Sequence, residues 1–306
     1  MREAEIDAGP LRIAYREYGS ADGWPCIMGH GFPYDVEAYA DVGPLLAEAG
    51  ARVLVPWLRG YGGTRFKPHL TMRSGEQAVL GGDMLALMDA LGIERAVLGG
   101  YDWGGRAACI VAALWPDRVA GLVTGNAYNI FDHAKANEPL PAKMEVALWY
   151  QYFFHSERGR RALIEDRRDV CRTLWQMWSP SWGFSDVDFT ASARSFDNPD
   201  FVDVVIHSYR HRYGLVPGDP AVAHIETRLT AQPVITVPTI AIDGEVDGVR
   251  GPTGGNPDKF SGPYDYRIWP DAGHNLPQEK PGDWVQAVLD VRAMGDTGLA
   301  GAGPLP

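Results

Sequence analysis

A carboxylate at the centre of a glycine-rich turn is the residue in this sequence best suited to covalent chemistry. Asp102 stands in the middle of residues 100–105 (GYDWGG), between a short apolar run and an apolar stretch of helical character. The glycines allow a strained turn in which a strand and a helix pass closely. A serine at such a position favours acyl transfer, whereas an aspartate suits attack on a saturated carbon and leaves an alkyl ester on the protein. Taken alone, the same residues also fit a plain strand-to-helix turn with an aspartate near the helix N-terminus.

Three further loops carry groups that could act with Asp102. Asp247 follows the apolar run 237–242, His274 follows the run 264–269, and His30 opens residues 30–33 (HGFP) after the run 25–28. If these runs are parallel strands, their carboxyl ends share one edge of a sheet, where ligands bind. The chain order nucleophile, acid, histidine is also the order found with this kind of turn. A single aspartate or histidine in a loop is often structural, but together they predict a triad with Asp102 as nucleophile, His274 as general base and Asp247 orienting His274.

Strand-like and helix-like runs alternate through most of the chain, which predicts an α/β fold with a parallel sheet covered by helices on both faces. Between residues 131 and 232 strand signals stop, apolar residues recur at helical spacing and aromatic residues are dense. We therefore predict a core formed by residues 1–130 and 233–297, a helical insertion at 131–232 and a flexible Gly/Ala/Pro-rich tail at 298–306. The expected strands are 11–18, 25–28, 52–56, 96–98, 121–124, 237–242 and 264–269, and the expected core helices are 39–49, 76–91, 107–115 and 282–294.

The composition is that of a folded soluble protein, with 45% hydrophobic and 22% charged residues among 306. The net charge of −11 argues against nucleic acid or an anionic membrane surface as a partner. Three scattered cysteines, an N-terminus without a signal-peptide core and the lack of a long apolar run favour a cytoplasmic location. No ligand set at zinc spacing is present, and neither a metal nor an organic cofactor is expected. The oligomeric state stays open, and a homo-oligomer is compatible with the sequence.

The combined pattern resembles the α/β-hydrolase superfamily and, within it, the epoxide hydrolase branch. The matching segments are residues 30–33 (HGFP), 100–105 (GYDWGG), 244–247 (GEVD) and 273–274 (GH). The resemblance implies an α/β-hydrolase fold, namely a mostly parallel twisted sheet flanked by helices, with the insertion forming a helical cap domain. An aspartate followed by tryptophan is shared with haloalkane dehalogenases, so this turn does not separate the two chemistries.

Cap tyrosines are the feature that the resemblance adds for epoxide opening. The alkoxide that departs from carbon is a poor leaving group, so an acid must protonate it. Epoxide hydrolases provide two cap tyrosines, one in a Tyr-Gln segment and one in a Tyr-Arg segment. Tyr150 resembles the first and Tyr209 the second, while Tyr152 and Tyr213 are close competitors. Packing within the cap is the alternative use of these side chains.

The resemblance also implies a complete reaction. Asp102 attacks an epoxide carbon, and water activated by His274 then hydrolyses the alkyl ester and releases a vicinal diol. The backbone N–H groups of Phe32 and Trp103 form the oxyanion hole. The implied partners are a small apolar epoxide and water. The residues expected to contact the substrate are His30, Pro33, Trp103, Trp149 and Tyr152.

Two other functions fit parts of the pattern. A haloalkane dehalogenase needs a second halide donor beside the Trp103 indole, which Trp149 or Trp175 could supply, although Phe32 stands where one dehalogenase pattern has asparagine. Haloacetate dehalogenases share residues 30–33 but carry arginine after the aspartate, where this chain has Trp103. A non-catalytic binding homologue would be expected to lack a triad or oxyanion-hole element, and none is missing here.

Overall fold

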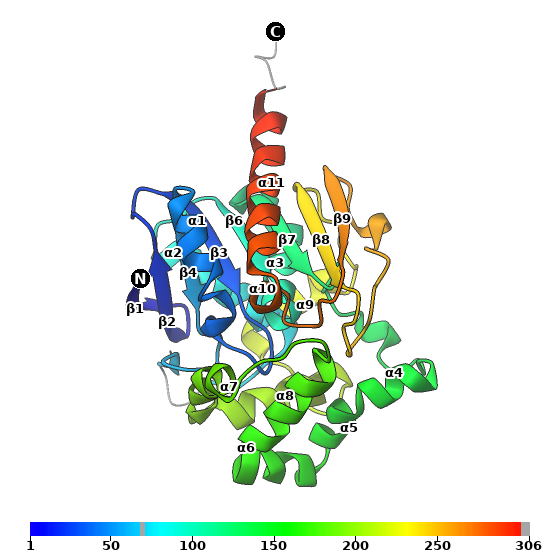
Figure 1. The fold of residues 1–306 in the computed structure, drawn as a ribbon. Helices are drawn as coiled ribbons and strands as arrows, with labels where there is room; N and C mark the ends of the chain where they lie inside the picture. The colour runs from blue at the N-terminus through cyan, green and yellow to red at the C-terminus, as the bar shows by residue number, and fades with distance from the viewer. Residues whose placement is uncertain (68–70, 301–306) are drawn as a thin grey trace.

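The computed structural model describes residues 1–67 and 71–300 of the chain, and its described part contains a nine-stranded, mostly parallel sheet (Figure 1). The strand order is β1-β2-β4-β3-β6-β7-β8-β9, with β5 paired to β2. The pairs that involve β2 are antiparallel, and all pairs from β4 to β9 are parallel. The bounds are β1 (Arg2–Ala8), β2 (Leu11–Tyr18), β3 (Trp24–Gly29), β4 (Ala51–Pro56), β5 (Arg65–Phe66), β6 (Ala96–Gly100), β7 (Val119–Gly125), β8 (Thr239–Gly244) and β9 (Tyr264–Trp269).

Helices cover both faces of this sheet. Figure 1 shows α1 and α11 on one face and α2 and α3 on the other. The central strands β6 and β8 are buried along their whole length, as parallel strands covered on both faces must be. The core helices are α1 (Val42–Glu48), α2 (Gln77–Ala90), α3 (Asp102–Leu114), α10 (Leu276–Glu279) and α11 (Pro281–Ala300), with short 3-10 turns η1 (Val36–Tyr39), η2 (Pro116–Arg118) and η6 (Pro257–Lys259).

The segment between β7 and β8 is helical, which is consistent with a cap domain, and it is called the cap below. Figure 1 shows α4 to α8 gathered at one end of the sheet. The longest cap helix, α6, buries Leu174, Trp175 and Trp178 at helical spacing, while most of its charged residues face outward. The elements are η3 (His133–Lys135), α4 (Ala142–Ala147), α5 (Trp149–His155), α6 (Glu157–Trp178), α7 (Asp186–Ala193), η4 (Arg194–Asp197), α8 (Phe201–Arg212), η5 (Pro220–Val222) and α9 (Ala223–Leu229).

The fold class predicted from the sequence is confirmed, with differences at individual elements. The strand expected at 11–18 is present, but β1 lies outside it as the edge of the sheet. The helix expected over 107–115 begins at Asp102, so Gly104 and Gly105 lie in its first turn rather than before it, while Gly100 ends β6. The helix expected over 39–49 is divided into η1 and α1. α11 reaches the third residue of the predicted tail (298–306), and residues 301–306 lie outside the described part.

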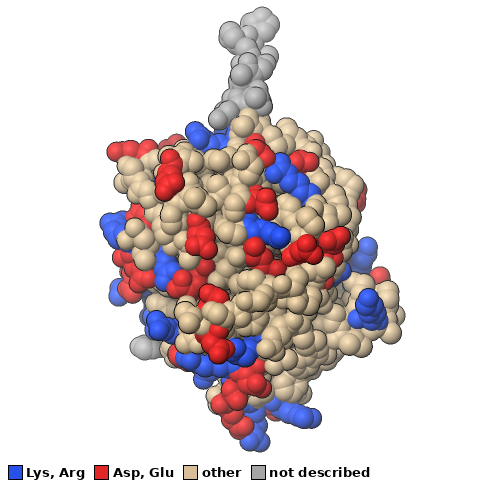
Figure 2. Space-filling view, viewed as in Figure 1, with Lys and Arg blue, Asp and Glu red and all other residues tan. Residues whose placement is uncertain are grey.

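The distribution of surface charge and the length of the helices are relevant to nucleic acid and membranes as partners. Figure 2 shows acidic and basic side chains interspersed on the displayed face, rather than gathered in a patch of one sign. Among the described residues, no helix combines the length and apolarity that crossing a membrane requires.

Candidate active site

The turn that carries Asp102 is tight because three backbone segments meet there. Asp102 itself has a left-handed backbone with φ of +49°, a conformation that L-residues rarely adopt outside strained sites. A Cβ atom on Gly104 would lie 2.0 Å from the carbonyl oxygen of Gly29, and one on Gly100 would lie 2.4 Å from the Gly104 carbonyl carbon. Only glycine therefore lets α3 start this close to the ends of β3 and β6.

The two carboxylate oxygens of Asp102 have different surroundings. Oδ1 accepts hydrogen bonds from the backbone N–H groups of Phe32 at 2.9 Å and Trp103 at 2.6 Å. Oδ2 lies 3.5 Å from His274 Nε2. Burial alone would raise the pKa of Asp102, but its hydrogen bond to His274, the charges of His274 and Arg106, and the Phe32 N–H outweigh burial and lower the pKa to about 2. The carboxylate is therefore ionised at neutral pH.

The other ring nitrogen of His274 bonds a buried carboxylate, that of Asp247. Its Nδ1 lies 2.8 Å from Asp247 Oδ2, which also accepts a hydrogen bond of 2.8 Å from Asn126 Nδ2. Asp247 Oδ1 accepts the N–H of Val249 at 2.7 Å. Burial alone would lower the pKa of His274, but the charge of Asp247, together with hydrogen bonds to Asp102 and Asp247, raises it to about 10. The resting group is thus an imidazolium between two carboxylates.

The loop that carries His274 is fixed by a cap residue. Ser179, directly after α6, accepts the backbone N–H of His274 at 3.0 Å and donates its hydroxyl to Glu279 at 2.6 Å. Glu279 in turn accepts the backbone N–H groups of Gly273 at 2.7 Å and Asn275 at 3.0 Å. The end of the longest cap helix therefore sets the position of the histidine loop.

Two buried cap tyrosines lie above this group. Tyr150 on α5 and Tyr209 on α8 have ring centroids 5.3 Å apart and are 2% and 1% exposed. The Phe32 ring contacts both, with centroid distances of 6.4 Å to Tyr150 and 5.4 Å to Tyr209. Tyr209 also lies 6.1 Å from the Trp103 ring. The structure therefore brings Tyr150 and Tyr209 close to the loop of residues 30–33 and to the turn of residues 100–105 that carries Asp102, which is called the elbow below.

Burial keeps both phenols protonated. It raises the pKa of Tyr150 to about 12, although the nearby Arg212 charge opposes this, and it raises the pKa of Tyr209 well above its usual value. The Tyr150 oxygen accepts a hydrogen bond of 3.0 Å from the side-chain amide of Gln151, which leaves the hydroxyl proton of Tyr150 uncommitted in that contact. Neutral phenols can donate hydrogen bonds at neutral pH.

The structure does not bring all predicted residues to this group. Tyr152 is 44% exposed and its hydroxyl bonds Glu145. Trp149 packs its ring on Phe153, and the competing Tyr213 donates its hydroxyl to Gln151.

His30 and Pro33 lie in the loop of residues 30–33 but are bound to other elements. The two ring nitrogens of His30 bond the Gly31 carbonyl at 3.0 Å and the Leu58 N–H at 3.1 Å, and burial lowers its pKa to about 4. Pro33 accepts the indole N–H of Trp175 at 2.8 Å. Their contacts are therefore with the protein, and they shape the loop that supplies the Phe32 N–H.

Sequence reasoning missed three contributors: Asn126, Trp178 and Ser179. Asn126 directly follows β7, so the rule that strand ends face the site would have found it. Trp178 lies 5.2 Å from the His274 ring and 4.9 Å from the Tyr150 ring. It and Ser179 belong to the cap, whose docking on the core leaves no local signal in the sequence.

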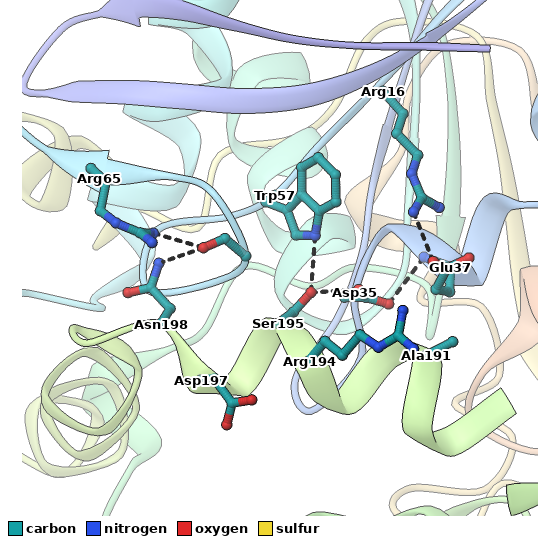
Figure 3. A pocket seen from close by; sticks show the side chains of 11 residues that line it. Arg16, Asp35, Glu37, Trp57, Arg65, Ala191, Arg194, Ser195, Asp197 and Asn198 are labelled. Carbon is teal, nitrogen blue, oxygen red and sulfur yellow. Dashed lines mark hydrogen bonds and ion pairs between the residues drawn. The ribbon is translucent and has the colours of Figure 1, made fainter. Parts of the chain in front are cut away.

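A separate polar cavity of about 300 Å³ lies at the junction of core and cap (Figure 3). Its polar groups are joined to one another: Trp57 donates to the Ser195 hydroxyl at 3.0 Å, Ser195 donates to Asp35, and Arg16 pairs with Glu37 at 2.7 Å. None of the residues predicted for the chemistry lines this cavity. The hydrogen bonds around this cavity therefore join η4 of the cap to the core, and the cavity is not part of the candidate active site.

Comparisons with known proteins identify the family of this chain. Residues 25–209 match the family model described as alpha/beta hydrolase fold, and the chain belongs to that family. Epoxide hydrolase A of Mycobacterium tuberculosis is 28% identical, over 94% of this chain and 96% of the relative. A haloalkane dehalogenase of Mycobacterium marinum is 29% identical, over 81% of this chain and 77% of the relative.

A crystal structure of a Klebsiella pneumoniae protein, named "putative epoxide hydrolase", has 45% identity and a TM-score of 0.94 over 95% of this chain and 97% of that one. The predicted superfamily, the resemblance to its epoxide hydrolase branch and the prediction that the chain is a hydrolase are therefore confirmed.

Proposed function

We propose that the chain is an epoxide hydrolase that opens a small apolar epoxide to a vicinal diol through an alkyl ester on Asp102. The observation that carries the proposal is the set of neighbours around Asp102. One of its oxygens is bound by two backbone N–H groups, the other faces His274, and the buried Tyr150 and Tyr209 lie against Phe32 and Trp103. A nucleophile, a base and two neutral acids are the groups that this two-step reaction requires.

The first step is attack by Asp102 Oδ2. The N–H groups of Phe32 and Trp103 both bind Oδ1, so Oδ2 is the carboxylate oxygen available to attack the epoxide carbon. As Oδ2 forms a bond to an epoxide carbon, the C–O bond of the ring breaks. Tyr150 and Tyr209 donate hydrogen bonds to the departing ring oxygen, and a phenol proton neutralises the alkoxide.

The second step is hydrolysis of the ester. Esterification removes the negative charge of Asp102, so the pKa of His274 falls from its raised value and the imidazolium gives up its proton, which restores the phenol that protonated the alkoxide. The neutral imidazole can then take a proton from water. The water oxygen adds to the ester carbonyl carbon, and Oδ1 becomes an oxyanion held by the Phe32 and Trp103 N–H groups. Collapse breaks the bond between Cγ and Oδ2 of Asp102, and the departing Oδ2 takes the proton held by His274 and leaves in the diol. Removing one oxyanion donor typically costs about 3 kcal/mol.

A single turnover in heavy-oxygen water tests the proposal. With enzyme in excess over styrene oxide, we expect the solvent oxygen in the Asp102 carboxylate, located by peptide mass spectrometry, and an unlabelled diol. Asp102→Ala should lose essentially all activity. Solvent oxygen found only in the diol, with an unlabelled protein, would contradict a covalent mechanism and point to direct attack by water.

A haloalkane dehalogenase is the second candidate, and two indoles favour it. The N–H groups of Trp103 and Trp178 are buried and have no hydrogen-bond partner in the described residues. Indole N–H groups are donors suited to halide. Of the two cap donors expected from the sequence, Trp175 already donates to Pro33 and Trp149 packs on Phe153, so Trp178 is the better candidate. Halide release from a bromoalkane, retained in a Tyr150→Phe, Tyr209→Phe double variant, would support this function.

A further inference from the structure

A group of histidines and glutamates lies where the cap meets the core, separate from the triad residues. His133 in η3, His211 in α8 and Glu226 in α9 each offer a ligand atom, and these atoms lie within 4.8 Å of one another. His133 Nε2 and Glu226 Oε2 lie 3.6 Å apart. The three residues are far apart in the chain, so their meeting is a property of the tertiary structure.

The polar atoms of this group are incompletely paired. His133 Nε2 and Glu76 Oε2 are buried and have no hydrogen-bond partner in the described residues, and Glu76 Oε2 lies 3.6 Å from His207 Nδ1. The 3.6 Å between His133 Nε2 and Glu226 Oε2 is longer than a hydrogen bond. Glu76, 2% exposed, His133 and His211 line one small cavity of about 10 Å³, the space of roughly one water molecule. Buried polar atoms without partners around such a small space require an explanation.

We propose that this group binds one divalent transition-metal ion of the zinc type, with His133, His211 and Glu226 as ligands and Glu76 as the nearest further carboxylate. Two imidazoles and a carboxylate are an established zinc donor set, with metal bonds of about 2.0 to 2.2 Å and therefore ligand atoms about 3.4 Å apart in a tetrahedron. The His133–Glu226 pair is already close to this separation at 3.6 Å. The His211 nitrogen lies within 4.8 Å of both atoms, so a side-chain rotation would bring it to this separation.

Charged groups of both signs lie around the proposed ion. Arg106 and Arg212 also line the cavity, but each guanidinium is engaged elsewhere. Arg212 lies over the rings of Phe131 at 5.3 Å and Tyr209 at 4.8 Å, and Arg106 Nε donates to the Asn129 carbonyl at 3.0 Å. The carboxylates of Glu76 and Glu226 supply two negative charges for the two positive charges of the ion, and the guanidinium groups remain as further positive charge beside it.

The carboxylate of Glu226 is already oriented toward the core. Its Oε1 accepts the backbone N–H of Ala78 at 3.0 Å in the first turn of α2, and its Oε2 lies 3.3 Å from Gln77 Nε2. Glu76 caps the same helix and accepts the Asp219 N–H at 2.6 Å. An ion held here would therefore join η3, α8 and α9 to the start of α2. Because α8 also carries Tyr209, the ion would fix the cap helix that bears a proposed acid.

Zinc binding to the whole protein tests the proposal. The chain is stripped with a chelator and titrated with zinc chloride in competition with a chromophoric chelator, and its melting temperature is followed with and without zinc. We expect one zinc per chain and a rise in melting temperature, because the ion binds the folded state only. Cobalt(II) should give the intense visible absorption of a tetrahedral site. A wild-type chain that binds no stoichiometric zinc overturns the proposal.

Matched variants locate the site. His133→Gln and His211→Gln should each lower zinc affinity at least tenfold and abolish the cobalt(II) spectrum. His224→Gln is the control, because His224 lies on the same helix as Glu226 but is exposed and outside the group. If a histidine variant does not fold, Glu226→Gln keeps an acceptor for the Ala78 N–H and should still lose zinc. Unchanged affinity in the His133→Gln, His211→Gln double variant would assign the zinc to another place and refute the site.

Discussion

The Nε2 atom of His274 lies 3.5 Å from Oδ2 of Asp102, while Nδ1 of the same ring lies 2.8 Å from Asp247. The first distance is too long for a strong hydrogen bond and short enough for direct attraction between charges. The arrangement ties the protonation of His274 to the state of Asp102: the ring is an imidazolium beside the free carboxylate and loses that partner once the carboxylate is esterified.

The first prediction concerns this switch. His274→Gln should still permit alkylation of Asp102 but block hydrolysis, because glutamine cannot take a proton from water. Intact-protein mass spectrometry after mixing with an epoxide should show a persistent increase equal to the mass of the substrate. Asp102→Ala, mixed in the same way, is the control and should show no increase. Free turnover by His274→Gln would rule out the two-step scheme.

The two cap phenols give the second prediction. Tyr150→Phe and Tyr209→Phe should each slow epoxide opening, and the double variant should lose about 10²- to 10⁴-fold in kcat/KM, the range typical of general acid catalysis. Tyr213→Phe is the matched control, because its hydroxyl bonds Gln151 rather than facing the elbow. Equal losses in Tyr213→Phe and Tyr150→Phe would show that cap packing, not acid catalysis, explains the effect.

The raised pKa of His274 gives a prediction for stability against pH. Its pKa is about 10 in the folded protein, against an ordinary value of 6.5. A group whose pKa is raised in the folded state contributes its full stabilisation of the folded protein at pH values below its unfolded-state pKa. This stabilisation is lost as the pH rises toward the folded-state pKa. The free energy of unfolding of the wild type, measured by urea denaturation relative to His274→Gln, should therefore fall by a few kcal/mol, in order of magnitude, between pH 6.5 and 10. A pH-independent difference would contradict the charge pairing.

The elbow glycine gives a prediction for folding. Gly104→Ala should destabilise the protein by about 3 kcal/mol or more, because the new Cβ would lie 2.0 Å from the Gly29 carbonyl oxygen and only backbone movement could relieve the clash. Gly183→Ala is the control, since a Cβ there meets nothing within 4 Å and its φ is not positive. Thermal unfolding of both variants, with residual activity, measures the effect. Similar melting temperatures for the two variants would mean that the close approach is not required.

Ser179 supplies the last prediction. Ser179→Ala leaves the His274 N–H and one Glu279 oxygen without their shared partner, which should cost about 1 to 3 kcal/mol of stability. As a positioning residue, Ser179 should affect hydrolysis more than alkylation, so the covalent ester should accumulate in stopped-flow experiments. Ser181→Ala, which removes only an exposed bond to the Asp271 carbonyl at 3.1 Å, is the control. An unchanged ratio of the two steps would limit Ser179 to a structural role.

The core of the site was predictable because its residues follow strands in the sequence. Asp102, Asp247 and His274 each come just after an apolar run, and a parallel sheet brings the carboxyl ends of such runs to one edge. The same rule would have found Asn126 after β7. The start of α3 at Asp102 was missed because glycines count against a helix in isolation, whereas here the crossing with Gly29 requires them.

The cap was less predictable because helical periodicity states which face of a helix is buried but not what it meets. Tyr150 and Tyr152 are equivalent by residue type, yet the first is 2% exposed and the second 44%. Trp175 and Trp178 both lie on the buried face of α6, but Trp175 donates its N–H to Pro33, whereas the N–H of Trp178, beside His274, has no hydrogen-bond partner in the part of the chain that the structure describes.

The sequence by itself therefore determined the fold class, the turn that carries Asp102 and the placing of Asp102, Asp247 and His274 at strand ends, since these depend on local patterns and on the geometry common to parallel sheets. Only the tertiary structure decided which cap side chains meet the elbow and that His133, His211 and Glu226 converge. Contacts between elements distant in the chain depend on how helices dock, and the pairing of buried polar atoms at that junction has no counterpart in local sequence.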